Sequence, residues 1–350
     1  MENIQVWNDW FLNPVQHNRC IGLFAYPGEP AYAFSSSLET SPEIEDRWIL
    51  QPFQSGGGLP GFSIPMQTKR RLDELHLLSK ENIQTAWESG MDYRLTSKSE
   101  FLEGVSTIQK HLGKAEGKLV MSIRNPIQLK AFSPVQTFTE LRDRYPKALV
   151  WFLSCPVAGT WVGASPEVLV CQFPGGIESW SLAGTRHVDG PDWTGKEIEE
   201  QSLVTKYLRQ AFIDFGLNPD FQEKPEEFQM GNLLHLRTRI FSKFSSDFPD
   251  AELARFAAHI HPSPAVGGYP SDQVFEKIAR IENQTRAYYS GYLGWKRTGR
   301  TRLYVNLRCA EIQQNRAIVF AGAGITSESD PESEWLEVQK KADLLLNVLR

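Results

Sequence analysis

Two glutamates, Glu200 and Glu337, stand where the apolar stripes of two predicted helices should face a core. A helix of 3.6 residues per turn aligns each of them with apolar side chains further along the same face. Because an unpaired carboxylate is costly to bury, each must meet a cation. Structural ion pairs are one interpretation, and Lys341, one turn after Glu337, is available for one of them. A shared divalent ion is the other, since two carboxylates, water and a substrate oxygen suit Mg²⁺.

Three further residues could take part in chemistry, although each also has an ordinary explanation. Glu167 follows a proline between two strand candidates, where a solvated acid at a strand end is the simpler interpretation. Lys118 opens the strand candidate KLVMSIR, and the same interpretation holds for it. Arg308 stands among apolar residues inside the predicted strand VNLRCAEI, so its guanidinium needs an acid partner from the protein or from a ligand.

The helix that carries Glu337 has the clearest local signals. Asp330 suits the N-cap, Pro331 suits the first helical position, and Glu332 favours the positive end of the helix dipole. Directly upstream, the predicted buried strand RAIVFAGAGI ends in Gly-Ala-Gly, where missing side chains let a ligand approach backbone N–H groups. We therefore expect this end of the chain to face a ligand.

The other segments predict strands in runs and helices in separate blocks. Residues 1 to about 70 are typical of strands, and residues 68–112 are mainly helical, with a short strand near Tyr93 and a capped helix SKSEFLEGVSTIQKHLG. Consecutive strands follow from Lys118, which predicts an antiparallel sheet. No repeat or low-complexity linker divides the chain. The pattern favours an α+β fold over a doubly wound one.

Composition excludes several classes of function. The 350 residues carry a net charge of −5 with scattered Lys and Arg, which argues against nucleic-acid binding. The N-terminus lacks the features of a signal peptide and no apolar run is long enough to span a bilayer, so a cytoplasmic protein is expected. The four cysteines show no metal-binding spacing and are expected to be reduced, and His259 and His261 lack a third ligand.

Nine motifs between Lys118 and Ala342 resemble those of the chorismate-binding enzymes, and within that family they are most similar to the isochorismate synthases. They cover roughly two thirds of the chain in the family's order. The motifs are KLVMSIR, GASPEVL, SLAGTR, KEIEEQSLV, HLRT, HPSPAVGGYP, RAYYSGYLGW, VNLRCAEI and FAGAGITSESDPESEWLEVQKKA.

The resemblance implies a single large α+β domain over residues 1–350, similar to anthranilate synthase component I. Two stacked, mainly antiparallel sheets would be flanked by helices, with a divergent β-rich part at 1–90 and the catalytic region at 91–350. The implied activity is Mg²⁺-dependent isomerisation of chorismate to isochorismate, in which water adds at C2 and the C4 hydroxyl leaves, for menaquinone or siderophore biosynthesis.

The resemblance also implies roles for particular residues. Lys118 would be the general base, neutral for part of the cycle, and Glu167 the general acid that protonates the leaving hydroxyl. Glu200 and Glu337 would ligate Mg²⁺. Glu197 and Glu334, one turn earlier on each helix, would hold metal-bound waters. The residues expected to bind or border the substrate are Gly184, Ala265, Tyr289, Arg308, Gly322, Gly324 and Lys341.

The choice of subfamily depends on the HPSPAVGG motif. His261, Ala265 and Val266 are similar to the water-using isochorismate pattern, whereas salicylate synthases and the ammonia-using anthranilate and aminodeoxychorismate synthases usually differ there. Those enzymes remain the alternatives. The sequence departs from the family at HVDG after the SLAGTR motif and at Thr285, where an Asp is common. The expected partner is a small-molecule substrate, with no glutaminase subunit, in a monomer or weak dimer.

Overall fold

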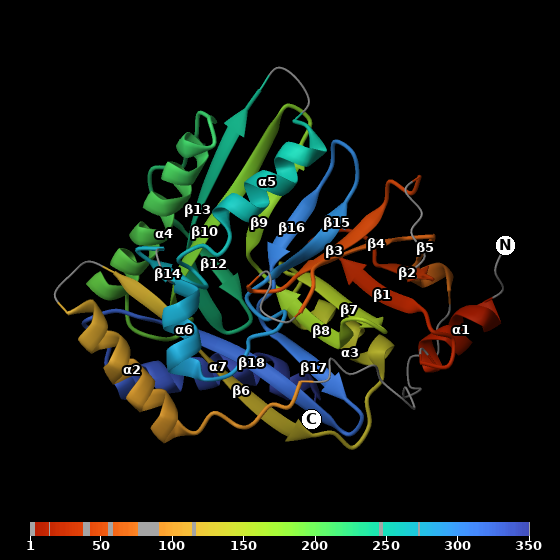
Figure 1. The fold of residues 1–350 in the computed structure, drawn as a ribbon, viewed down its shortest axis with the longest axis horizontal. Coiled ribbons are helices and arrows are strands. Elements are labelled where there is room, and N and C mark those ends of the chain that lie inside the picture. Colours follow the sequence, from red (N-terminus) through yellow and green to blue (C-terminus); the bar gives the residue numbers. More distant parts are fainter. Residues whose placement is uncertain are drawn as a thin grey trace.

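Two large sheets organise the protein (Figure 1), and in the computed structural model residues 4–13, 15–37, 43–54, 59–75, 91–113, 117–244, 248–271 and 274–349 are described. All strand pairs in this part of the chain are antiparallel. The first sheet has the order β14 (Gly268–Tyr269), β6 (Lys118–Gln128), β18 (Arg316–Ile325), β17 (Cys309–Gln313), β8 (Gly159–Ser165), β7 (Leu149–Cys155), β1 (Cys20–Ala25), β2 (Tyr32–Ser36) and β5 (Thr68–Arg71). The second has the order β11 (Asp220–Phe221), β13 (Leu233–Lys243), β10 (Gly176–His187), β9 (Val168–Phe173), β16 (Arg302–Val305), β15 (Tyr292–Lys296), β3 (Arg47–Gln51) and β4 (Phe62–Pro65), with β12 (Glu226–Met230) also paired to β13.

Helices cover the outer faces of both sheets. The described helices are α1 (Ile4–Leu12), α2 (Lys98–Leu112), α3 (Pro134–Arg144), α4 (Gly195–Asp214), α5 (Asp250–Ile260), α6 (Val274–Glu282) and α7 (Pro331–Leu349), with a 3₁₀ turn at Leu72–Glu74. Helices α2, α3 and α7 contact the first sheet, and α4 and α5 contact the second. An aromatic core lies between the sheets, where the rings of Phe24 and Trp48 are 5.2 Å apart. These layers confirm the predicted α+β fold with two stacked sheets.

The N-terminal strands belong to both sheets. Strand β1 lies between β7 and β2, and β3 lies between β15 and β4, so this part of the chain does not form a separate unit. The same pairing places Cys20 opposite Cys155, and the structure joins them in a disulfide. The expectation of reduced cysteines was wrong for this pair, because strand pairing across 135 residues leaves no spacing motif.

Local signals gave the starts of α2 and α7 correctly, but they missed α1 and misplaced some strands. Ser97 caps α2 together with Glu100, and Asp330 accepts a hydrogen bond from the backbone N–H of Ser333 in α7, as predicted. Thr68–Arg71 is strand β5 rather than helix, no strand forms at Tyr93, and α1 was not predicted. Tertiary pairing overrides weak local preference in such short segments. Residues 76–90, within the predicted helical stretch, lie outside the described residues.

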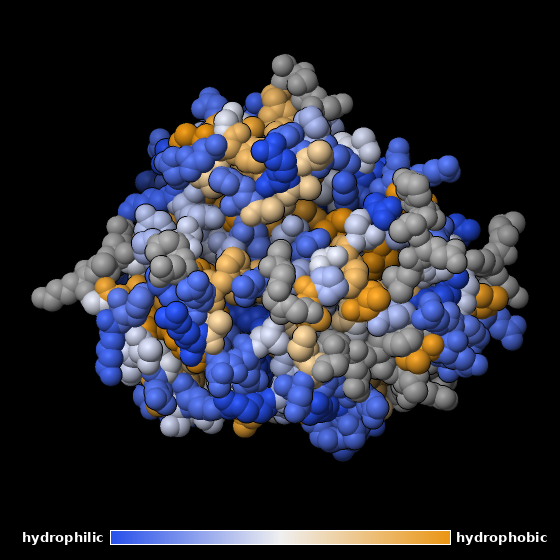
Figure 2. Space-filling model, viewed as in Figure 1, coloured by the Kyte–Doolittle hydropathy of each residue, from blue (hydrophilic) through white to orange (hydrophobic). Residues whose placement is uncertain are grey.

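Hydrophilic side chains cover most of the molecular face in Figure 2. This agrees with the charged fraction of 23% in the sequence. In the described part of the chain, no helix is both long and apolar enough to cross a bilayer.

Two connections carry the chain between the sheets at neighbouring points. Pro166 and Glu167 link β8 of the first sheet to β9 of the second, and residues 306–308 lead from β16 back to β17. Hydrogen bonds join the two connections: the Val305 N–H donates to the Glu167 carbonyl at 3.0 Å, and the Ala164 N–H donates to the Arg308 carbonyl at 3.1 Å. Arg308 therefore lies between strands, not inside one as predicted, and it has a left-handed backbone with φ 48°.

A buried carboxylate ties α6 to β6 beside these connections. Glu282, the last residue of α6, accepts hydrogen bonds from Ser122, Arg124 and Arg286, and its side chain is 1% exposed. Arg286 also donates to the carbonyls of Val120 and Val266. The three charged side chains thus fix β6 against the segment that contains the HPSPAVGG motif.

We expect Glu282→Ala to lower the free energy of unfolding by about 3–5 kcal/mol, because it leaves two buried guanidinium groups without their shared acid. Equilibrium unfolding in urea measures the change. The control is Glu276→Ala on the same helix, where an exposed pair with Arg280 should contribute less than about 1 kcal/mol. Equal decreases in the free energy of unfolding of the two variants would show that the buried cluster contributes no more to stability than the exposed pair.

Candidate active site

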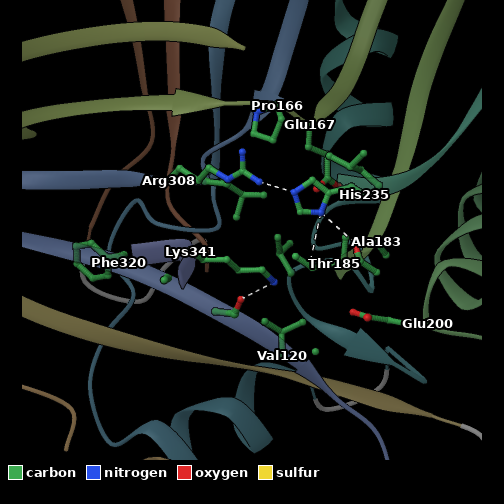
Figure 3. A pocket seen from close by; sticks show the side chains of 18 of the residues that line it. Val120, Pro166, Glu167, Ala183, Thr185, Glu200, His235, Arg308, Phe320 and Lys341 are labelled. Atoms are coloured by element: carbon green, nitrogen blue, oxygen red, sulfur yellow. Dashed lines mark hydrogen bonds between the residues drawn. The ribbon is translucent and has the colours of Figure 1, made fainter. Parts of the chain in front are cut away.

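A cavity opens where the two connections meet β10, β13 and β18. In Figure 3, Pro166, Glu167, Arg308 and His235 lie on one side of it, Val120 and Glu200 lie on the other, and Lys341 extends between them. Nine of the residues singled out in the sequence line this cavity. They are Glu167, Gly184, Glu200, Ala265, Tyr289, Arg308, Gly322, Gly324 and Lys341.

Glu167 is a buried carboxyl group with an unusual protonation equilibrium. Its side chain is only 3% exposed, and burial raises its pKa to about 8, although the positive charges of Lys118, Arg308 and Lys341 oppose the shift. The carboxyl group is therefore mainly protonated at neutral pH. A buried acid in that state can donate a proton to a ligand in the cavity.

Lys118 and Glu200 form an ion pair at the floor of the cavity. The Lys118 ammonium donates to Glu200 Oε1 at 2.7 Å, and the lysine is completely buried. Burial alone would raise the pKa of Glu200, but the charges of Lys118 and Lys196 lower it overall. A Cβ atom at position 324 would lie 2.2 Å from Glu200 Oε1 and 3.0 Å from the Lys118 Nζ. Gly324 therefore makes room for the pair, and Lys118 reaches the cavity through Glu200 rather than by lining it.

The acids of α7 are placed differently from the prediction. Glu337 is paired with Lys341 at 2.7 Å and its side chain is 20% exposed, whereas Glu334 is 1% exposed. The buried stripe of the helix continues from Glu334 to Val338 and Ala342, so the predicted stripe was wrong by part of a turn. Lys341 also donates to the carbonyl of Gly322 at 3.1 Å.

Glu334 is held by groups that were not predicted. Its Oε1 atom accepts hydrogen bonds from the Lys196 ammonium and from the hydroxyl of Ser329. Its Oε2 atom is buried without a hydrogen-bond donor among the described residues. Burial and the negative charge of Glu337 raise the pKa of Glu334. Lys196 belongs to the quoted KEIEEQSLV motif, but periodicity offered no reason to select it.

Glu197 has a local structural task in α4. Its Oε2 atom accepts a hydrogen bond from the backbone N–H of Thr194 at 2.9 Å and another from the Thr194 hydroxyl, which closes the first turn of the helix. A Cβ atom at position 184, where φ is +71°, would lie 3.1 Å from the Glu197 Cβ. Gly184 thus lets the start of α4 approach β10.

The acids as placed suit a hard cation but do not converge on one point. In the ranges given above, no three Asp, Glu, His or Cys side chains are close enough to hold an ion unaided. The sequence predicted that Glu200 and Glu337 each meet a cation, either a lysine or a shared divalent ion. In the structure Glu200 pairs with Lys118 and Glu337 pairs with Lys341. Carboxylate oxygens, including the buried Oε2 of Glu334, are nevertheless the donors that Mg²⁺ prefers.

His235 is a cavity residue that the sequence reasoning missed. Its Nδ1 faces the carbonyl of Gly184 at 2.9 Å, and its Nε2 contacts Arg308 Nη2. A carbonyl only accepts and a guanidinium only donates, so the proton lies on Nδ1 and the ring is neutral. Burial and the charge of Arg308 lower the pKa of His235, in agreement. In the sequence, only its place in the HLRT motif could have pointed to His235. Its place beside the cavity depends on the register shift between β10 and β13, which is a tertiary feature.

Arg308 has no acid partner in the described chain. Its Nη1 atom is buried without an acceptor, and no described carboxylate forms an ion pair with it. Burial lowers its pKa to about 10, so it remains charged at neutral pH. Of the two partners that the sequence allowed, a ligand anion is the one that fits this arrangement.

Tyr289 and Ala265 complete the wall of the cavity. The Tyr289 ring stacks on Phe320 with centroids 5.4 Å apart, and its hydroxyl would lie 2.8 Å from a Cβ at position 322. Ala265 and Val266, from the loop that contains the HPSPAVGG motif, also line the cavity. A cavity with apolar wall residues, a guanidinium that has no acid partner in the described chain and a buried acid suits a small, mainly apolar anion.

The chain is similar to known proteins over most of its length. The model of the chorismate binding enzyme family matches residues 63–350. The vibriobactin-specific isochorismate synthase of Vibrio cholerae serotype O1 is 32% identical over 197 residues, which are 53% of this chain and 49% of that protein. The matched region thus spans about half the length of the curated relative.

Two solved structures share the fold. The putative 2,3-dihydroxybenzoate-specific isochorismate synthase of Bacillus anthracis has a TM-score of 0.77 at 23% identity, covering 94% of this chain and 96% of that one. The menaquinone-specific isochorismate synthase of Escherichia coli has a TM-score of 0.77 at 20% identity, covering 98% and 91%. Because the family model extends over most of the sequence, including every cavity residue, the chain belongs to the chorismate-binding enzymes.

Proposed function

We propose that the protein is an isochorismate synthase, which adds water at C2 of chorismate and releases the C4 hydroxyl. The observation that carries the proposal is the presence, on two adjacent connections, of a buried acid with a raised pKa and of a guanidinium that has no acid partner among the described residues. Chorismate offers a matching set of groups, namely a carboxylate to bind and a hydroxyl that leaves only when protonated. The named relatives act on the same substrate class, which supports the assignment.

The residues divide the work of the reaction as follows. Arg308, held by neutral His235, binds the enolpyruvyl carboxylate, and Tyr289 lies beside it. Glu167 gives its proton to the C4 hydroxyl, which departs as water. Lys118, as the neutral amine, takes a proton from the water that attacks C2. One water enters and one leaves, so substrate and product are isomers.

Lys118 cannot act as a base while its ammonium is paired with Glu200. In the structure the two groups are 2.7 Å apart, so the amine must lose a proton before each turnover. Glu200 then remains as the acceptor that orients the amine. Because Glu200 is also a proposed metal ligand, the protonation of Lys118 depends on the same carboxylate that would bind the metal.

The proposed metal ligands are Glu200 and Glu337. Glu197 and Glu334 would hold the waters bound to the metal. When bound there, Mg²⁺ would neutralise the ring carboxylate of the substrate and fix the ring. Lys341 lies next to Glu337 and extends into the cavity, where its charge favours the same carboxylate. Gly184, Ala265, Gly322 and Gly324 provide the space around the ring.

The proposed reaction can serve either of two pathways, and in both of them water is the nucleophile. One named relative is specific for vibriobactin and another for menaquinone, so either a siderophore or menaquinone pathway fits. Water is the nucleophile, so no glutaminase subunit is required. The substrate is a small molecule and the proposed cofactor is Mg²⁺.

The purified protein is expected to convert chorismate to isochorismate when Mg²⁺ is present and to stop when EDTA removes the ion. Separation of products by HPLC measures this. The control repeats the incubation with ammonium ions. Salicylate with pyruvate, or an amine product that needs ammonia, would contradict the proposal and support one of the alternative activities.

Glu167→Gln and Lys118→Ala should each lower kcat by about 10²–10⁴-fold, because each removes a group that transfers a proton. Stopped assays with HPLC detection give the rates, and near-UV circular dichroism tests the fold. Glu199→Gln, an exposed acid on α4, is the matched control and should retain wild-type turnover. Near-normal turnover in a folded Glu167 or Lys118 variant would contradict the role of that residue.

The value of kcat/KM should fall above about pH 8. A general acid works in its protonated form, and the pKa of Glu167 in the free protein is about 8, so loss of this proton should lower activity by up to tenfold per unit above that pH. Initial rates from pH 6 to 10 measure the profile. The residual activity of Glu167→Gln should lack this decrease, and a flat wild-type profile across pH 8 would exclude Glu167 as the acid.

A further inference from the structure

Lys196 occupies a position that a helix does not favour for a cation. It is the second residue of α4, in the turn where the helix dipole is positive. Its ammonium is nevertheless fixed, because it pairs with Glu334 of α7 and lies within the negative field of Glu337 and Glu200. The acids of the site, not the helix, hold this lysine in place.

The lysine joins the two helices that carry the proposed metal ligands. Glu200 belongs to α4 and pairs with Lys118 of β6, while Glu337 pairs with Lys341 inside α7. Lys196 alone among these three lysines forms an ion pair from α4 to α7. Three carboxyl groups thus face three ammonium groups, and the added positive charge of a divalent ion would unbalance them.

The Lys196 pair differs from the Lys118 pair in two ways that favour exchange with another cation. The Lys196 side chain is 22% exposed and borders solvent, whereas Lys118 is fully buried. Glu334 Oε2, in contrast, is buried without a donor among the described residues, which is costly for a carboxylate. The pair with Lys196 therefore satisfies only one of the two oxygens.

We propose that Lys196 is a resident counter-cation, which holds the carboxyl groups of α4 and α7 in the metal-free protein and is displaced into solvent when the divalent ion binds. The inference depends on the proposed Mg²⁺-dependent function. An ammonium and a divalent ion compete for the same negative charge, so the lysine keeps the empty site folded and also weakens its affinity for the metal. Lys196 is in this sense a positioning residue and does not contact the substrate.

The test is calorimetric titration of MgCl₂, without substrate, into the wild-type protein and into Lys196→Met. Methionine keeps most of the apolar stem and removes the charge. We expect the Kd for Mg²⁺ to fall by about tenfold or more, since the ion no longer has to displace a cation that is paired with Glu334 in a partly screened site. Lys340→Met, an exposed lysine of α7, removes the same charge from the surface and should leave the Kd unchanged.

Thermal unfolding with and without Mg²⁺ provides a second test of the role of Lys196. Without metal, Lys196→Met should melt at a lower temperature than the wild type, because Glu334 loses its partner. Saturating Mg²⁺ should raise the Tm of the variant more than that of the wild type, and Lys340→Met should behave as the wild type. If the methionine variant does not fold, Lys196→Gln, which keeps a hydrogen-bond donor without the charge, carries the same expectation.

The outcomes separate the two proposals. Mg²⁺ that binds both proteins with the same Kd, or binds the Lys196 variant more weakly, would overturn the counter-cation while leaving the metal site intact. No binding of Mg²⁺ to either protein would overturn the metal site of the proposed function and the inference with it. Tighter binding only in the Lys196 variant supports both.

Discussion

The hydrogen bonds between the two inter-sheet connections are the constraint on which the site depends. They hold the Glu167 carbonyl against Val305 and the Arg308 carbonyl against Ala164. With the backbone fixed in this way, an acid and a guanidinium project into the same cavity from segments about 140 residues apart in the sequence. The left-handed backbone of Arg308 is part of this arrangement, and strained residues of this kind persist where the surrounding structure determines them.

Burial then decides what these groups can do. The same low-polarity surroundings raise the pKa of Glu167 to about 8 and lower the pKa of His235, and they leave Arg308 without an acid partner among the described residues. On the other side of the cavity, carboxylates are matched by lysines, because buried charges of one sign would repel one another. The cavity thus presents a guanidinium on one side and carboxylates paired with lysines on the other.

Sequence reasoning succeeded where chemistry is local. Asp330 and Pro331 mark the start of α7, and Ser97 marks the start of α2, because caps act within one turn. It was less accurate for helix faces, where Glu334 rather than Glu337 is the buried acid. A difference of three residues is nearly one turn, so a small drift in the assumed period exchanges the two positions.

The groups that the sequence did not indicate are those selected by tertiary structure. His235 matters because β13 places it beside Arg308, and Lys196 matters because α4 faces α7. Neither has a spacing that marks it. Arg308 was placed inside a strand because its neighbours are apolar, but those neighbours belong to the layer between the sheets, where the chain changes from one to the other.

The N-terminal strands pair at one end of each sheet, and this has a practical consequence for truncation of the protein. Strands β1 and β3 cover what would otherwise be open borders of β7 and β15. A truncated protein that began at residue 91 would retain all the cavity residues and still present two rows of unsatisfied backbone groups, which are templates for intermolecular aggregation. The N-terminal strands therefore protect the borders of the two sheets that carry the cavity.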